Sequence, residues 1–159
     1  MGEKFTFFWS GPFSNWAKSD FVYKNKKFSS SEQALMWEKA MMFGDEANAQ
    51  KILETRDPSR QKFIGRLIEG YVDEQWAAAR LEIVTEILRH KFRQSTGMYD
   101  ALMETSGTTL VGASPLDKIW GIGLAAENPD CLNRDTWQGL NLLGIALTTV
   151  RTELENERG

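Results

Sequence analysis

A succession of capped segments with helical periodicity fills the chain after Ser29 and limits it to a mainly helical fold. Most of these segments begin with a residue that commonly caps a helix N-terminus, such as Asp45 or Asp57, or end at a glycine, such as Gly44 or Gly70. Both are typical signals of helix ends. The expected helices cover residues 29–43, 45–55, 57–68, 73–94, 99–104 and 136–156. In the last one, apolar residues recur every three or four positions and form a core-facing stripe: Leu140, Leu143, Leu147, Val150 and Leu154.

Strands are expected only as short pieces. Residues 5–9 are typical of a strand, residues 20–28 of a hairpin with its turn near Asn25, and residues 108–113 of a further strand. The sequence therefore predicts a mainly α, multihelical single domain over residues 1–159, with a few short β-strands near the N-terminus and middle.

The composition is that of an ordinary soluble globular protein, with 42% hydrophobic and 26% charged residues. The longest apolar tract, residues 140–150, is too short to span a membrane, and no signal peptide is recognised at the N-terminus. We therefore expect a cytoplasmic protein without a membrane partner.

Several kinds of chemistry are excluded by the residues at hand. A single cysteine, Cys131, and a single histidine, His90, rule out an internal disulfide and disfavour a thiolate or imidazole metal cage. A Ser–His–Asp triad would have to use His90, which sits in a helical run. A net charge of −3 disfavours duplex nucleic acid as a partner, so any phosphate would have to meet a local basic pocket. By elimination we expect carboxylate-driven chemistry with no metal and no cofactor.

Glu32 and Lys39 form the first candidate pair. Seven residues apart on a helix, they differ by about 20° around its axis and lie about 10 Å apart along it, so they could bracket a sugar phosphate. The alternatives are that Glu32 belongs to a capping box opened by Ser29, and that Lys39 is a solvated surface lysine.

The segment from Asp117 to Gly123 is the second candidate, a loop after a predicted strand. Asp117 could hold a ribose hydroxyl or a water, and Trp120 could stack on a flat base or sugar. Gly121 and Gly123 would let the backbone approach a ligand closely. The alternative is a loop whose tryptophan anchors it to the core.

Four further residues complete the set of binding candidates. Arg66 could grip a phosphate with its guanidinium, and Trp76 lies across the same turn. Asn15 sits in a loop after the first strand, and Asn141 near the start of the last helix, where anions bind readily. The alternatives are a surface arginine, a core tryptophan and an asparagine cap.

Taken in order, short blocks of this sequence resemble the NADAR superfamily and its YbiA-like branch over about residues 7–151. The blocks are Phe13-Ser14-Asn15-Trp16, Phe21-Val22-Tyr23, Ser30-Ser31-Glu32-Gln33, Glu38-Lys39-Ala40, Ile64-Gly65-Arg66, Trp76 with Arg80, Lys91-Phe92, the 114–123 segment, and 139–144 with Arg151. The resemblance implies a mostly helical fold and hydrolysis of N-glycosidic bonds next to a phosphorylated ribose. It implies a pocket lined by Glu32 and by Asp117, Trp120, Gly121 and Gly123.

Two positions depart from the family pattern. Gln33 stands where the family usually has a histidine, so a histidine proton donor is not present there. Leu35-Met36-Trp37 replaces an aromatic-Gln-Ala run. Because the extra aromatic Trp37 could serve a second base, ADP-ribose-type ligands are slightly favoured; the alternative is that Trp37 is a core residue.

The resemblance implies an N-glycoside hydrolase with Glu32 and Asp117 as catalytic residues. Its substrate would be ADP-ribose linked to a base, as in ADP-ribosylguanine, or a ribosylaminopyrimidine phosphate of riboflavin synthesis. The substrate could be a small molecule or ADP-ribosylated nucleic acid, and no obligate protein partner is implied. The alternatives are a non-catalytic ADP-ribose or NAD-binding module that leaves its ligand intact, and a scaffold without a ligand.

Overall fold

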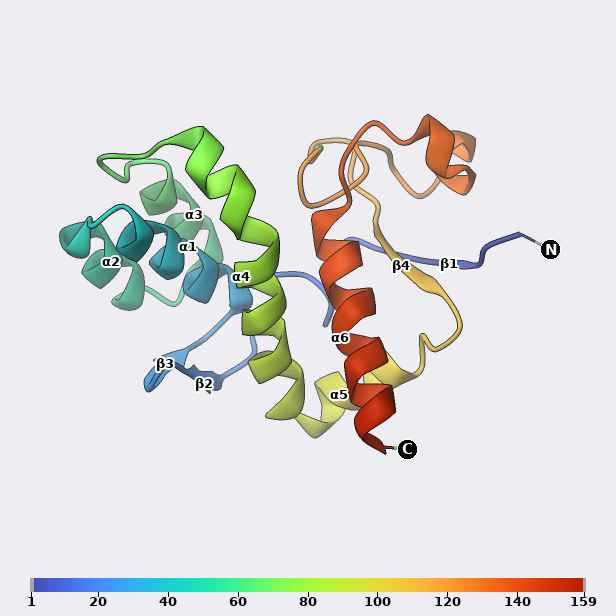
Figure 1. Ribbon diagram of the computed structural model, residues 1–159, viewed down its shortest axis with the longest axis horizontal. Coiled ribbons are helices and arrows are strands. Elements are labelled where there is room, and N and C mark those ends of the chain that lie inside the picture. The colour runs from blue at the N-terminus through green and yellow to red at the C-terminus, as the bar shows by residue number, and fades with distance from the viewer. Residues whose placement is uncertain (1, 159) are drawn as a thin grey trace. The chain divides into compact units, whose positions relative to one another are not determined.

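The computed structural model describes residues 2–158, in which helices dominate and the strands are short (Figure 1). The mainly α fold class predicted from the sequence is confirmed. The chain divides into two compact units, residues 15–96 and the residues on either side of them. The prediction that residues 1–159 form one domain stays a prediction.

The unit of residues 15–96 combines one hairpin with four helices. Strands β2 (Phe21–Tyr23) and β3 (Lys26–Phe28) pair antiparallel. Lys24 and Asn25 between them both have positive φ angles, of 52° and 64°, which is the geometry of the tight turn that matches strand twist. The predicted hairpin and its turn are confirmed.

Helix α1 (Ser31–Met42) is the centre of this unit and packs against the other three helices (Figure 1). These are α2 (Glu46–Leu53), α3 (Pro58–Gly65) and α4 (Asp73–Arg93). The predicted caps of α2 and α3 are confirmed, since the carboxylates of Asp45 and Asp57 accept backbone N–H groups at the two helix starts. Helix α3 ends at Gly65 and not at Ile68, where the prediction had placed its end. A Cβ at Gly65 would come within 2.2 Å of the Met36 sulfur of α1, so a larger residue there would force the Met36 side chain to move.

The other unit is built on two parallel strands. Strand β1 (Phe5–Phe8) pairs with β4 (Thr109–Gly112), and helix α6 (Leu142–Arg158) packs on β4 (Figure 1). Side chains of the α6 region complete the hydrogen bonding of β4, because Leu110 N–H donates to Thr148 Oγ1 at 3.0 Å and Gly112 N–H donates to Asn141 Oδ1 at 2.9 Å. Helix α5 (Thr96–Met103) begins three residues earlier than predicted.

The predicted start of the last helix at Thr136 is wrong, because α6 begins at Leu142. Residues 138–141 instead run along the loop at 118–122: the N–H groups of Gln138 and Leu140 donate to the carbonyls of Ile122 and Lys118 at 2.9 and 2.8 Å. Leu140 is accordingly 55% exposed, whereas the remaining residues of the predicted stripe are buried. Among the helices that the structure describes, none has the length and apolarity that crossing a membrane would require.

Candidate active site

The first turn of α1 determines where Glu32 lies. The side chain of Ser30 caps the helix by accepting the Gln33 N–H at 3.1 Å, so the helix begins at Ser31 and Glu32 is its second residue. The predicted capping box of Ser29 and Glu32 is therefore wrong by one position. Glu32 keeps only 7% of its surface exposed. At this position the helix dipole favours an ionised carboxylate.

Gln33 does the work that the capping-box alternative assigned to Glu32. Its Oε1 accepts the Ser29 N–H at 2.7 Å, and its Nε2 donates to the carbonyls of Ile52 and Thr55 at 3.0 Å each. The glutamine thus ties the start of α1 to the end of α2. The residue that replaces the family's histidine is 3% exposed and engaged in structural hydrogen bonds.

Asn15 fixes the other side of the same turn. Its carbonyl accepts the Glu32 N–H at 2.9 Å, and its Oδ1 accepts the Ser31 hydroxyl at 2.8 Å. Asn15 is 6% exposed. These contacts make it a residue that positions the backbone of Glu32, and a direct contact between Asn15 and a substrate stays a prediction.

Lys39, two turns further along α1, is the centre of a group of charged and aromatic residues. Its Nζ donates to the Gly65 carbonyl at 3.0 Å and lies 4.6 Å from the centre of the Tyr71 ring. Burial lowers the pKa of Lys39 below its usual value, the carboxylates of Glu32 and Asp73 act to raise it, and Arg66 acts to lower it further. We call this group the Lys39 cluster; it consists of Glu32, Lys39, Arg66, Tyr71, Asp73 and Trp76.

The structure brings together the predicted residues Glu32, Lys39, Arg66 and Trp76 in this cluster. Arg66 lies just after α3 and is exposed. Trp76, by contrast, is 5% exposed, and its ring centre lies 6.0 Å from Lys39 Nζ. The tryptophan contributes to the cluster by its cation–π contact with Lys39.

Tyr71 and Asp73 are cluster members that the sequence analysis missed. The Tyr71 hydroxyl donates to Asp73 Oδ1 at 2.7 Å, and burial together with this hydrogen bond raises the pKa of Tyr71 to about 12. The turn between α3 and α4 brings both residues to Lys39. The sequence signal available was an aromatic residue and an aspartate at the start of the long predicted helix.

The loop at Asp117 is organised by that aspartate. Its Oδ1 accepts the backbone N–H groups of Ile119 and Trp120 at 2.9 Å each. A side chain at Gly121 would come within 2.8 Å of the Gly112 carbonyl, and Gly123 has a φ of 73°. The glycines are therefore required by the packing and turn of the loop itself, and their approach to a ligand stays a prediction.

Asn141 is 1% exposed, and its side chain forms hydrogen bonds with the backbone of strand β4. Its Oδ1 accepts the Gly112 N–H at 2.9 Å, and its Nδ2 donates to the Leu110 carbonyl at 3.1 Å. Its side-chain oxygen and nitrogen are thus both engaged within the protein. The predicted substrate contacts of Asn141, Asp117 and Trp120 stay predictions.

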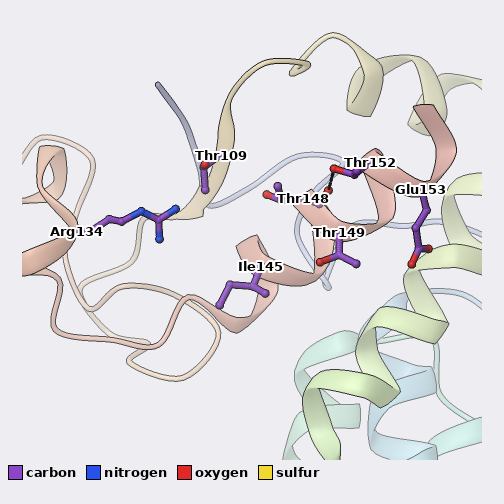
Figure 2. Close-up of a pocket in the computed structure, with 7 residues that line it drawn as sticks. All are labelled: Thr109, Arg134, Ile145, Thr148, Thr149, Thr152 and Glu153. Carbon is purple, nitrogen blue, oxygen red and sulfur yellow. Dashed lines mark hydrogen bonds between the residues drawn. The ribbon is translucent and has the colours of Figure 1, made fainter. Parts of the chain in front are cut away.

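None of these candidates is a lining residue of two surface pockets found in the described residues. One, shown in Figure 2, is lined mainly by threonines of α6 together with Thr109 and Arg134. The Arg134 guanidinium is held by the Glu3 carboxylate, so this cation is already neutralised. The other is lined by charged residues of α4 and by Tyr23, Lys24 and Glu38.

Over residues 2–158, no group of three or more His, Cys, Asp or Glu side chains is arranged to hold a metal ion. Whether the chemistry is independent of metal stays a prediction.

Comparisons with known proteins show what the chain is similar to. Residues 7–155 match a protein family described as the NADAR domain. The chain is 38% identical over 146 residues to an N-glycosidase of Acanthamoeba polyphaga mimivirus, covering 89% of this chain and 86% of that protein. It is 32% identical over 112 residues to the chloroplastic riboflavin biosynthesis protein PYRR of Arabidopsis thaliana, covering 68% of this chain but 17% of the relative. The NMR structure of the E. coli protein YbiA matches with a TM-score of 0.80 at 25% identity, over 99% of this chain and 89% of that one.

Proposed function

Because the chain belongs to the NADAR domain family and is an N-glycosidase, we propose that it hydrolyses the bond between a base and a phosphorylated ribose. The observation that carries this proposal is the Lys39 cluster. It places a nearly buried carboxylate, Glu32, in one group with the cations of Lys39 and Arg66. A carboxylate can stabilise the positive charge that develops on the ribose, and cations can bind the phosphate.

Glu32 is the proposed catalytic carboxylate. An N-glycosidic bond breaks through a transition state with positive charge on the ribose, which a nearby carboxylate stabilises. The bonding electron pair leaves with the base nitrogen, and a water oxygen attacks the ribose C1. Glu32 accepts the proton that this water loses, and the proton then passes to the departing nitrogen directly or through solvent.

Lys39 and Arg66 are the proposed phosphate-binding residues. The Lys39 ammonium has three hydrogens and gives one to the Gly65 carbonyl, so it can still donate to a phosphate. The exposed guanidinium of Arg66 can bind phosphate with two parallel hydrogen bonds. We propose from the family resemblance that Asp117 and Trp120 contact the ribose and the base.

The identity of the base is a finer proposal. The family resemblance makes both ADP-ribose linked to a base and ribosylaminopyrimidine phosphates candidate substrates. A relative named riboflavin biosynthesis protein supports the second. From the sequence, ADP-ribose is slightly favoured because Trp37 could serve a second base. In the structure Trp37 is 7% exposed and its ring lies 5.7 Å from that of Phe28, which supports the core alternative. A preference for ADP-ribose must therefore rest on other residues.

The proposal is tested by incubating the protein separately with ADP-ribosylguanosine and with a ribosylaminopyrimidine phosphate, followed by mass detection of free base and ribose product. We expect release of the base from at least one of the two. Recovery of both compounds intact, with one of them bound, would instead identify a binding module.

A further inference from the structure

The Lys39 ammonium contacts one carbonyl and two aromatic rings. Its Nζ donates to the Gly65 carbonyl at 3.0 Å, and it lies 4.6 Å from the centre of the Tyr71 ring and 6.0 Å from that of the Trp76 ring. The contact with Tyr71 is the closer one, because 6.0 Å is the outer limit of a cation–π contact. An ammonium has three hydrogens, so the carbonyl and the Tyr71 ring can take two and leave one for a ligand.

Two further contacts fix the Tyr71 ring. Its hydroxyl donates to Asp73 Oδ1 at 2.7 Å, and Asp73 is the first residue of α4, where the helix dipole favours a carboxylate. The ring also packs edge to face against Phe43, the residue that caps the end of α1, with the ring centres 5.3 Å apart and the planes at 65°. The ring is thus attached to the end of one helix and to the start of another.

The apolar packing of Tyr71 does not account for this arrangement. Tyr71 is 38% exposed, so its ring buries less apolar surface than a core ring does. A lysine side chain is flexible, and holding it in one place costs conformational entropy. That cost is offset in function where a fixed ammonium meets its ligand without having to be ordered first.

We propose that Tyr71 is a positioning residue, which holds the Lys39 ammonium with its ring face in the place where it binds the phosphate of the substrate. Asp73 acts one step further back, by orienting the Tyr71 hydroxyl. This inference rests on the proposed function, because it takes the phosphate to lie at Lys39. The cation is attracted by the face of the ring, so phenylalanine can replace tyrosine in this contact and an aliphatic residue cannot.

The test is a double-mutant cycle on the binding of ribose 5-phosphate, measured by titration calorimetry on the full chain. We expect Tyr71→Leu to weaken binding about tenfold, the size of a lost cation–π contact at a partly desolvated site. Tyr71→Phe keeps the ring and should retain most of the affinity. In a Lys39→Met background, Tyr71→Leu should cause no further loss, because the cation that the ring holds is already absent.

Tyr99→Leu is the matched control. Tyr99 also lies beside a cation, with the Arg158 guanidinium 5.9 Å from its ring centre, but it belongs to the other compact unit of the chain. This variant should leave the affinity for ribose 5-phosphate unchanged. A thermal melt of every variant ensures that affinities are compared between folded proteins.

Three results would overturn the inference: wild-type affinity in Tyr71→Leu, an equal loss in Tyr71→Phe, or a loss that persists in the Lys39→Met background. Failure of the wild type to bind ribose 5-phosphate would overturn it as well. Turnover of the wild type is measured separately. If the wild type cleaves its substrate but the cycle shows no coupling between Tyr71 and Lys39, the inference fails and the proposed function stands. If coupling is seen without any turnover, the proposed hydrolysis fails and the positioning role stands.

Discussion

The hydroxyl of Ser30 accepts the backbone N–H of Gln33 at 3.1 Å, and this contact sets the first turn of α1. With the cap one position later than the sequence indicated, Glu32 becomes the second helical residue and Gln33 takes the reciprocal structural role. Gln33 therefore has the structural role that the capping-box alternative gave to Glu32, and the catalytic role of Glu32 stays a prediction.

We predict that Glu32→Gln lowers kcat about 100-fold or more, as expected for loss of a positioned acid–base group. Glutamine has the same size, and loss of one carboxylate at a helix start costs under about 1 kcal/mol, so the melting temperature should change little. A turnover rate and a thermal melt on the same preparation measure both effects.

Ser30→Ala is the matched control for this variant. It removes the cap and should cost about 1 kcal/mol of stability while turnover at a temperature well below the melt is retained. A Glu32→Gln variant with full activity would remove Glu32 from the mechanism.

Lys39 should give the reaction a pH dependence on the alkaline side. Because burial lowers its pKa below 10.5, the ammonium is fully charged at low pH and loses its charge earlier than an ordinary lysine as the pH rises. KM for a phosphorylated substrate should therefore increase between neutrality and pH 10.5. Lys39→Arg stays charged over this range and should abolish the increase. If the arginine variant shows the same increase, another group is responsible.

At Asp117 two substitutions should separate loop structure from charge. Asp117→Asn keeps an oxygen that can accept the N–H groups of Ile119 and Trp120, whereas Asp117→Ala keeps none. We expect the alanine variant to lose about 1–2 kcal/mol of stability, and the asparagine variant much less. If Asp117 also contacts the substrate as a carboxylate, Asp117→Asn should reduce kcat/KM despite its intact fold. An unchanged kcat/KM in Asp117→Asn would show that the carboxylate of Asp117 has only a structural role.

Gly144→Ala tests the packing of α6 on β4. A methyl group there would collide with the Leu110 carbonyl and the Asn141 amide, so we expect a loss of about 1–3 kcal/mol in the free energy of unfolding, measured with urea. Gly97→Ala, in helix α5 with open space around the glycine, should be neutral or stabilising by up to about 1 kcal/mol. Equal stability of the two variants would contradict the close approach of α6 to β4.

Exhaustive chelation should leave the turnover rate unchanged. We expect this because a chain with one histidine and one cysteine offers few of the ligands that transition metals prefer. The measurement is activity after treatment with a chelator and again after addition of zinc. Loss of activity that zinc alone restores would show that the prediction is wrong.

The sequence by itself determined the elements whose signals are local. Asp45 and Asp57-Pro58 start their helices, and Lys24-Asn25 turns the hairpin, because a cap or a turn needs only residues within a few positions of one another. Helical periodicity likewise placed Glu32 and Lys39 on one helix, where the carboxylate acts on the pKa of the lysine.

Only the tertiary structure decided the features that depend on residues far apart in the sequence, such as the start of α6 and the residues that surround Lys39. Helix α6 starts six residues later than its pattern indicated, because the N–H groups of Gln138 and Leu140 bind carbonyls of another loop. Tyr71 and Asp73 join Lys39 through the turn between α3 and α4. A backbone donor that finds a buried acceptor elsewhere in the fold gains a hydrogen bond worth as much as a helical one, and no pattern of neighbouring residues encodes where that acceptor will be.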